Sequence, residues 1–444
     1  MVKRKFLLAG LISMAVSVAV HAKEILEITV DDAVEAALTT NVSVKKESIS
    51  LNQAKREYRH SWNNFLPSVT AGATGATQDS SASATGQTYS LTGSVNASLS
   101  LSASLVQKIK LLKEAYQSGQ ADYEDTVRDV ETTVRKAFYS ILYQQQNVES
   151  YKANEKSYEK QYEQTKTKKE RGLVPELDLL TAEVNLKSAK LDLKNAEKDY
   201  YNSVIDFLNE IGLETNPAET EVVFKGTLDD ADAFTEKKDE PPTKEKIDEL
   251  VDNSPSVRSA KSELATAKLN KTYTATSSYL PSLNLSASLS PFEKTYYKDS
   301  GETADSDSWS ASVGVNIPLD GLVPGSAKMD SVLEKDDTIK TLELELSDTK
   351  KSVRTQVFEK IHDIEISNET IEERKLNMEL AKKTYEMTEE AYSRGTKDLL
   401  TVQNALDSYR SAQVEWRKEQ YNLISYVLDL ENLLGLESGS LLKN

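Results

Sequence analysis

The stretch YSLTGSVNASLSLSASL, residues 89–105, decides what kind of fold this chain forms. Ser, Thr or Asn fills every even position from 90 to 104, and the apolar residues lie at odd positions: Leu91, Val95, Ala97, Leu99, Leu101, Ala103 and Leu105. A period of two predicts a β-strand, because successive side chains point to opposite faces of a sheet. One face of this strand is apolar, and the other is polar but carries no charge.

Three further segments alternate in the same way, at about 68–77, 282–290 and 309–319. Strands of this length with one apolar face match membrane β-strands, which need about 9 to 11 residues to cross the hydrocarbon layer. Open sheet edges cannot face lipid, and four strands cannot close a barrel. We therefore expect three chains to share one barrel of twelve strands around a wet interior. The polar connections 79–88 and 293–308 are predicted to be exposed loops.

The mature chain is a tandem duplication. A shift of 223 residues aligns RGLVPELDLLTAEV from Arg171 with RGTKDLLTVQNALD from Arg394. A shift of 214 aligns NNFLPSVTAGAT from Asn63 with SSYLPSLNLSAS from Ser277. We divide the chain into a signal peptide (1–22), a first repeat (23–214), a linker (215–242) with one short strand at Glu221–Phe224, a second repeat (243–437) and a C-terminal tail (438–444).

Each repeat contains one very long helix, predicted at 107–171 and at about 326–394. Some 65 residues at 1.5 Å per residue give a rod of roughly 100 Å. Apolar residues recur every three or four positions, which is coiled-coil spacing, as in Leu399, Val402, Leu406, Tyr409, Trp416, Leu423, Val427, Leu430 and Leu434. The predicted fold is mainly α: duplicated helical hairpins forming an α-barrel tunnel, with four strands per chain in a shared, trimeric, twelve-stranded membrane β-barrel.

The N-terminus is typical of a cleaved secretory signal. Three basic residues precede an apolar core from Phe6 to Val20, and Val20-His21-Ala22 fits a cleavage site. The alternative, an uncleaved anchor, would need about 20 apolar residues, more than this core holds. Removal of the three basic residues changes the net charge from −17 to −20, so we expect no nucleic-acid partner.

Signals for catalysis, metals or cofactors are weak. Cys is absent, and His60 and His362 are the only histidines after the signal, so no metal site is predicted. No Gly-rich phosphate loop with Lys-Ser/Thr occurs. The acidic residues fit solvated helix faces, and no spacing of carboxylates recommends a hydrolase. We therefore expect a protein that is not an enzyme and holds no cofactor.

The duplicated order of helix, two strands and long helix resembles the TolC family of outer-membrane efflux proteins. Both Leu-Pro-Ser helix ends, NIPLDG at Asn316 and the two Arg-Gly turns carry this resemblance, which covers about residues 25–437. It implies a homotrimer whose barrel lies in outer-membrane lipid above a periplasmic helical tunnel. It also implies that the periplasmic tip opens when an inner-membrane transporter and a periplasmic adaptor protein dock.

The same resemblance implies where the gate lies. Gly172 and Gly395 would form the two tip turns. Asp178, in GLVPELD, matches an acidic residue that pairs with a Tyr and a basic residue around the second turn, here Tyr392 and Lys397. The alternative is that Asp178 only favours the start of a helix and that Lys397 is solvated.

This sequence departs from the family pattern at the constriction. Some members carry acidic residues, which trap cations, at the positions of Thr401 and Asn404; both are neutral here. Asp398 lies one turn from Thr401 and is the candidate substitute. Without such a substitute, cation block at this tip is not expected.

The predicted function is a passive outer-membrane exit duct of a tripartite efflux or type I secretion system, gated at its periplasmic tip. The alternative is a periplasmic coiled-coil structural or adaptor protein without a pore.

Overall fold

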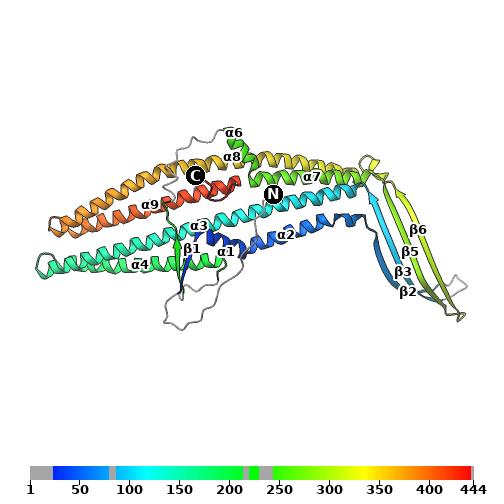
Figure 1. Cartoon of the computed structure of the whole chain (residues 1–444), viewed down its shortest axis with the longest axis horizontal. Helices are drawn as coiled ribbons and strands as arrows, with labels where there is room; N and C mark the ends of the chain where they lie inside the picture. The colour runs from blue at the N-terminus through cyan, green and yellow to red at the C-terminus, as the bar shows by residue number, and fades with distance from the viewer. Residues whose placement is uncertain (1–23, 80–86, 214–219, 230–243, 442–444) are drawn as a thin grey trace.

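The computed structural model describes residues 24–79, 87–213, 220–229 and 244–441, and shows long helices with one β-sheet at one end (Figure 1). The predicted signal peptide and most of the predicted linker and of the loop 79–88 lie outside these ranges. The elements are β1 (Glu24–Thr29), α1 (Val30–Thr40), α2 (Val42–Arg59), η1 (Ser61–Phe65), β2 (Ser68–Asp79), β3 (Gln87–Ser102), α3 (Ser104–Glu170), α4 (Glu176–Glu210), β4 (Thr220–Lys225), α6 (Lys244–Asn253), α7 (Pro255–Tyr279), β5 (Ser282–Tyr297), β6 (Thr303–Asn316), η2 (Asp320–Leu322), α8 (Ala327–Ser393) and α9 (Leu399–Leu434).

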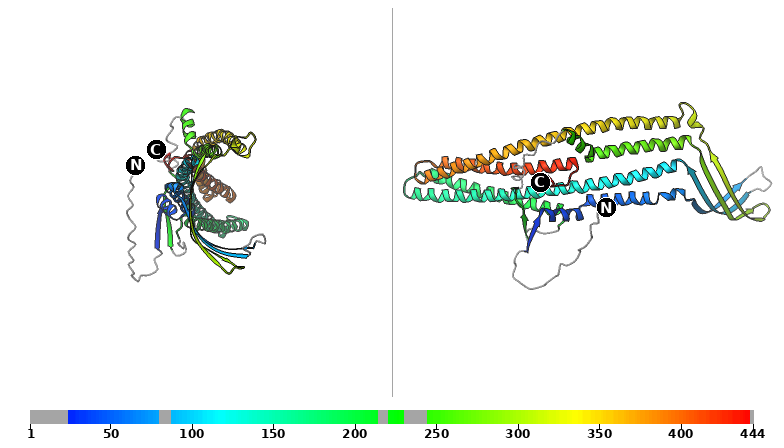
Figure 2. Two further views of the ribbon diagram at one scale, coloured as in Figure 1. Left: turned by 90° about the vertical axis from the view of Figure 1, so that its right-hand side faces the viewer. Right: turned by 45° about the horizontal axis from the view of Figure 1, so that its top comes forward.

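The two longest helices form the framework of the helical wall. α3 and α8 have 67 residues each, which corresponds to about 100 Å. Towards the sheet, α3 packs between α2 and α7; towards the other end, it packs between α4 and α9, while α8 packs against α7 and then α9 (Figure 2). In the described parts, no helix has an apolar run long enough to cross a membrane.

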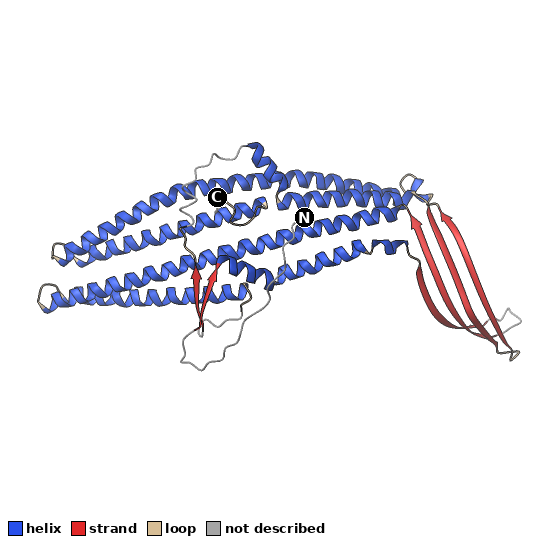
Figure 3. Cartoon of the chain, in the orientation of Figure 1, coloured by secondary structure: helices blue, strands red, loops and turns tan. Residues whose placement is uncertain are grey.

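The sheet joins the two halves of the duplication. Its strand order is β2-β3-β5-β6, and every neighbouring pair is antiparallel. β3 leads into α3 and β5 follows α7, so the order of strands matches the order of helices beneath them (Figure 3). The outer strands β2 and β6 run in opposite directions, and all of their residues are exposed.

The second hairpin is longer than the sequence indicates. The prediction that 293–308 is a loop is wrong, because β5 continues to Tyr297 and β6 begins at Thr303. The pairing is interrupted between Ser290 and Glu293, where Pro291 has no N–H to donate, and then resumes with Glu293 opposite Ser306. β6 also ends at Asn316 rather than at 319.

A small parallel sheet covers the middle of the helical wall. The strand predicted at Glu221–Phe224 is confirmed as β4. Its partner β1, residues 24–29, was not predicted. Phe224 packs edge-on against Phe138 of α3 and Phe207 of α4, and all three rings are buried in the largest core cluster. This core anchors the first helical hairpin, formed by α3 and α4, at the middle of the molecule. The opposite end of the hairpin, where α3 turns into α4, lies outside this core and is the free end of the helical wall.

The helical tip as a candidate gate

Both helical hairpins turn at the free end with the same backbone geometry. In each, an arginine caps the C-terminus of the long helix and a glycine follows it, Gly172 with φ 73° and Gly395 with φ 79°. The amide of Leu173 donates to the carbonyl of Lys168 at 2.9 Å, and the second turn repeats this bond. Such a closure needs a left-handed residue, which glycine adopts without strain. The two glycines predicted for the tip turns therefore lie in those turns.

Tyr392, in the last turn of α8, connects the two hairpins. Its side chain is buried, and its hydroxyl shares a hydrogen bond of 2.7 Å with that of Thr165 on α3. The ammonium group of Lys168 lies 3.6 Å from the centre of the Tyr392 ring and also donates to the Tyr392 carbonyl oxygen. Burial raises the pKa of the Tyr392 hydroxyl, the Thr165 hydrogen bond opposes this rise, and the Asp178 carboxylate adds to it.

The structure places Asp178 near Tyr392, but it does not show the predicted pairing of Asp178 with Tyr392 and Lys397. Asp178 is half-buried in the first turn of α4. No hydrogen bond or ion pair links it to Tyr392 or Lys397 in the described ranges, so its effect on Tyr392 is electrostatic. Lys397 is exposed in the second turn. In this single chain, the partners that hold Tyr392 are Thr165 and Lys168.

Neither Thr165 nor Lys168 is predicted above, although the sequence holds a signal for Thr165. The buried face of α3 changes from apolar residues, including Val134, Phe138 and Ile141, to mostly polar ones: Ser150, Asn154, Gln161 and Thr165. The three-four spacing continues through this change. Polar residues at core positions indicate a contact with a partner helix that hydrogen bonds specify.

Asp398 caps α9. Its carboxylate accepts a 2.8 Å hydrogen bond from the amide of Thr401 and another from the Thr401 hydroxyl, which together lower the pKa of Asp398. The predicted constriction residue Thr401 is thus half-buried and bonded to Asp398, whereas Asn404 is exposed. The first turn differs, because Pro175 stands at the corresponding position and provides no side-chain cap.

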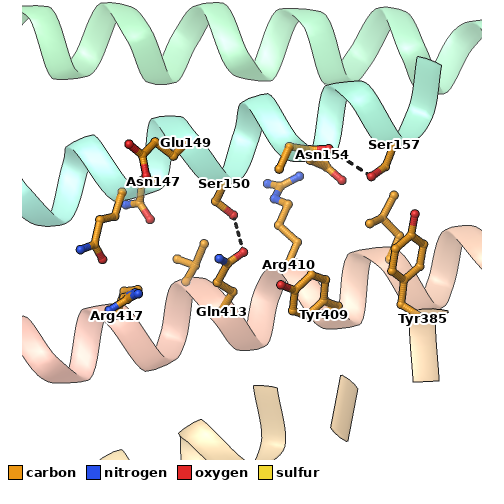
Figure 4. Close-up of a pocket in the computed structure, with 14 residues that line it drawn as sticks. Asn147, Glu149, Ser150, Asn154, Ser157, Tyr385, Tyr409, Arg410, Gln413 and Arg417 are labelled. Atoms are coloured by element: carbon orange, nitrogen blue, oxygen red, sulfur yellow. Dashed lines mark hydrogen bonds between the residues drawn. The ribbon is translucent and has the colours of Figure 1, made fainter. Parts of the chain in front are cut away.

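Above the tip, polar side chains also fill the contact between α3 and α9. Ser150 donates to Gln413 at 2.9 Å, and the Tyr158 hydroxyl donates to Asp407 at 3.0 Å. A cavity of about 230 Å³ lies beside the bond between Ser150 and Gln413, and Arg410 extends into it from α9 (Figure 4). The hairpins therefore meet through hydrogen bonds and water-accessible space as well as through apolar contacts.

Comparison with known proteins identifies the chain. A family model described as "Outer membrane efflux protein" matches residues 33–212 and 247–436, which fall in the two halves of the duplication. The chain belongs to the outer membrane efflux protein family. The resemblance to TolC-like proteins is thereby confirmed, and the protein is an outer-membrane efflux duct rather than a pore-free periplasmic scaffold. Efflux proteins of this family are channels, not enzymes.

Solved structures of this efflux type share the fold. The outer membrane channel CmeC of Campylobacter jejuni has 16% identity and a TM-score of 0.74, over 91% of this chain and 85% of that one. The open-state MtrE outer membrane channel of Neisseria gonorrhoeae has 16% identity and a TM-score of 0.73, over 92% and 89%. The outer membrane protein VceC of Vibrio cholerae has 14% identity and a TM-score of 0.71, over 91% and 96%. No curated protein sequence matches the chain.

Proposed function

We propose that three copies of this efflux protein close into one sealed duct. The observation that carries this proposal is the four-stranded sheet with two open edges. Among the residues that the structure describes, the backbone groups on the outer sides of β2 and β6 have no sheet partner. In a bilayer each unpaired group costs several kcal/mol, so these edges need partner strands. Because β2 and β6 run in opposite directions, β6 of one copy fits β2 of the next as an antiparallel pair.

The edges of the helical wall support the same assembly. The outer helices α4 and α8 each expose large apolar side chains, at Leu177, Leu180, Val184 and Leu191 on α4 and at Leu376, Leu380 and Met387 on α8. Leu177 is 71% exposed and Met387 is 63% exposed. Apolar stripes of this kind stabilise a helix contact when they are removed from water. The occupant consistent with the sheet edges is a second copy of this chain.

The tip is the proposed gate. Its hairpins are joined by Tyr392, Thr165 and Lys168, and the buried face of α3 is largely polar there. Separating the hairpins at this end breaks hydrogen bonds that bonds to water can replace. It also exposes part of an apolar cluster that contains residues of both hairpins, among them Tyr158, Tyr392 and Leu406. Asp178 and Lys397 are proposed as further gate residues that contribute in the trimer. Asp398 is proposed to hold the start of α9 in place.

The proposed partners follow from what the chain lacks. Its sequence has no nucleotide-binding loop, so energy for export has to come from an inner-membrane transporter, coupled through a periplasmic adaptor that docks at the tip. Passage through the duct itself is then passive.

A planar bilayer measurement tests the duct and the gate together. Purified trimer should show a small, mostly closed conductance, and Asp178→Ala and Tyr392→Phe should each raise it. Unchanged conductance in both variants would contradict the gating role of Asp178 and Tyr392, but it would not contradict the existence of the pore. A protein that stays soluble in the periplasm and gives no conductance would contradict the duct.

A further inference from the structure

Glu431, in the last turn of α9, is a completely buried carboxylate. Its exposed fraction is 0%, and no basic side chain of the described ranges forms an ion pair with it. Burial raises the pKa of Glu431, and hydrogen bonds from residues 439–441 oppose this rise more than the positive charge of Arg135 does. A buried carboxylate is strongly unfavourable unless hydrogen-bond donors satisfy it. The position of Glu431 therefore depends on such donors.

In the described ranges, every hydrogen-bond donor to this carboxylate comes from the C-terminal segment 438–441. The amides of Gly439 and Leu441 donate to it at 2.6 Å and 2.5 Å, and the Ser440 hydroxyl donates at 3.3 Å. Gly439 has φ 78°, a left-handed conformation that glycine adopts without strain. The turn at Gly439 thereby aims two backbone amides at one anion. Residues that the sequence assigns to a C-terminal tail thus form a binding site for Glu431.

The same segment attaches the end of α9 to α3. Ser438 shares a hydrogen bond of 3.1 Å with Thr132 of α3, and both side chains are buried. One turn away on α3, Asp129 accepts a hydrogen bond of 2.8 Å from Asn432 of α9. Leu441 is half-buried against the largest core cluster. The segment therefore connects the last turn of α9 to the middle of α3.

The composition of the segment indicates which contact holds it in place. Ser438-Gly439-Ser440-Leu441 contains one large apolar side chain, so little of its docking can come from burial of apolar surface. Its bonds to Glu431 join a charged acceptor to neutral donors, and such bonds are stronger than those between neutral groups. The segment and the carboxylate thus depend on each other, because each satisfies the polar groups of the other.

We propose that residues 438–441 are a C-terminal clamp, which holds the end of α9 against α3 by satisfying the buried Glu431. The clamp lies at the middle of the molecule, beside the core that anchors the first helical hairpin (Figure 1). Movement of the second helical hairpin, formed by α8 and α9, is then confined to the opposite end, at the tip. This inference concerns residues outside the proposed gate and applies to a single chain as well as to a trimer.

The test measures hydrogen exchange over residues 430–434, in detergent, for the purified full-length protein and three variants. The first variant ends at Glu437 and so lacks the clamp. The second carries Glu431→Met, which keeps the length of the side chain but removes its charge. The third combines both changes. The matched control is Glu437→Met, the same substitution at an exposed glutamate.

Deletion of the clamp leaves the Glu431 carboxylate without its donors, so residues 430–434 should exchange about 100-fold faster than in the full-length protein. Adding Glu431→Met should bring the rate back to within about tenfold of the full-length protein, because a buried methionine needs no donors. Glu431→Met alone should expose the Leu441 amide to exchange. The Glu437→Met control should behave as the unaltered protein.

Two results would overturn the inference directly: no faster exchange after deletion, or no recovery when Glu431→Met is added to the deletion. An equal effect in the Glu437→Met control would do the same. Equally fast exchange at residues 401–405, at the other end of α9, would exclude a local clamp. If the truncated chain is not obtained as folded protein, recovery of the combined variant supports the clamp, and failure to recover it overturns the clamp.

Discussion

Removal of the Lys168 ammonium should open the tip. In Lys168→Met the side chain keeps its apolar length but loses the hydrogen bond to the Tyr392 carbonyl and the contact with the Tyr392 ring. A hydrogen bond to a charged group contributes about 1.5 to 3 kcal/mol, and a cation over an aromatic ring about 0.5 to 1 kcal/mol at an exposed site. Because Lys168 is only half-buried, solvent reduces both, and about 2 kcal/mol is the expected loss per chain.

This loss sets the size of the effect on gating. A change of 1.4 kcal/mol is a factor of ten in an equilibrium constant, so about 2 kcal/mol corresponds to about 30-fold. Open probability in planar bilayers should therefore rise about 30-fold if one hairpin contact opens at a time, and further if the three copies open together.

The matched control is Lys166→Met, which removes the same charge from an exposed lysine that has no ion-pair partner in the described part of the chain. Its open probability should stay at the wild-type value. An equal rise in both variants would show that charge at the tip, rather than the contact with Tyr392, controls opening. No rise in Lys168→Met would refute the reasoning outright.

Three further changes test other parts of the tip. Tyr392→Phe loses only the hydrogen bond to Thr165, so open probability should rise about fivefold, less than in Lys168→Met. Gly395→Ala meets no neighbouring atom but forces a left-handed alanine, which costs about 1 kcal/mol; the Thr396 amide should exchange about fivefold faster, and an unaltered rate would contradict the assigned turn. The lowered pKa of Asp398 means that its cap persists above the ordinary pKa of about 4 and weakens as pH falls below it. Protection of the Thr401 amide, corrected for intrinsic exchange, should fall with pH there in the wild type and not in Asp398→Asn.

The sequence predicts the regular parts of this protein well, because long stretches repeat one period. The apolar spacing of α3 predicts a helix at 107–171, and the structure has Ser104–Glu170. The alternation at 89–105 likewise predicts a strand, and the structure has β3 at Gln87–Ser102. Where the period breaks, the prediction of secondary structure fails: Pro291 and Phe292 interrupt the alternation of β5, so the sequence does not indicate the strand beyond them.

Contacts between distant segments were harder to predict. β1 is short and precedes α1 directly, and only its pairing with β4, almost 200 positions later, shows that it is a strand. At the tip, Lys168 is one of four basic residues within 166–171, and nothing in its local sequence distinguishes it. Lys168 contacts Tyr392 because α3 packs against the end of α8. This packing cannot be inferred from a single sequence.

The central claim is that neighbouring copies pair β6 with β2, and cross-linking between these strands tests it most directly. The chain has no Cys, so any disulfide comes from introduced residues. Thr70→Cys on β2 is combined with either Ser310→Cys or Ser312→Cys on β6, which lie on the same polar face. Within one sheet the two edges are three strand spacings apart, about 14 Å, too far for a disulfide.

Oxidised protein from outer membranes should therefore give bands of one, two and three linked chains on a non-reducing gel, and none larger, for at least one pair. Both pairs failing to link copies, or a ladder that ends at two or continues beyond three, would contradict a barrel built from three four-stranded sheets.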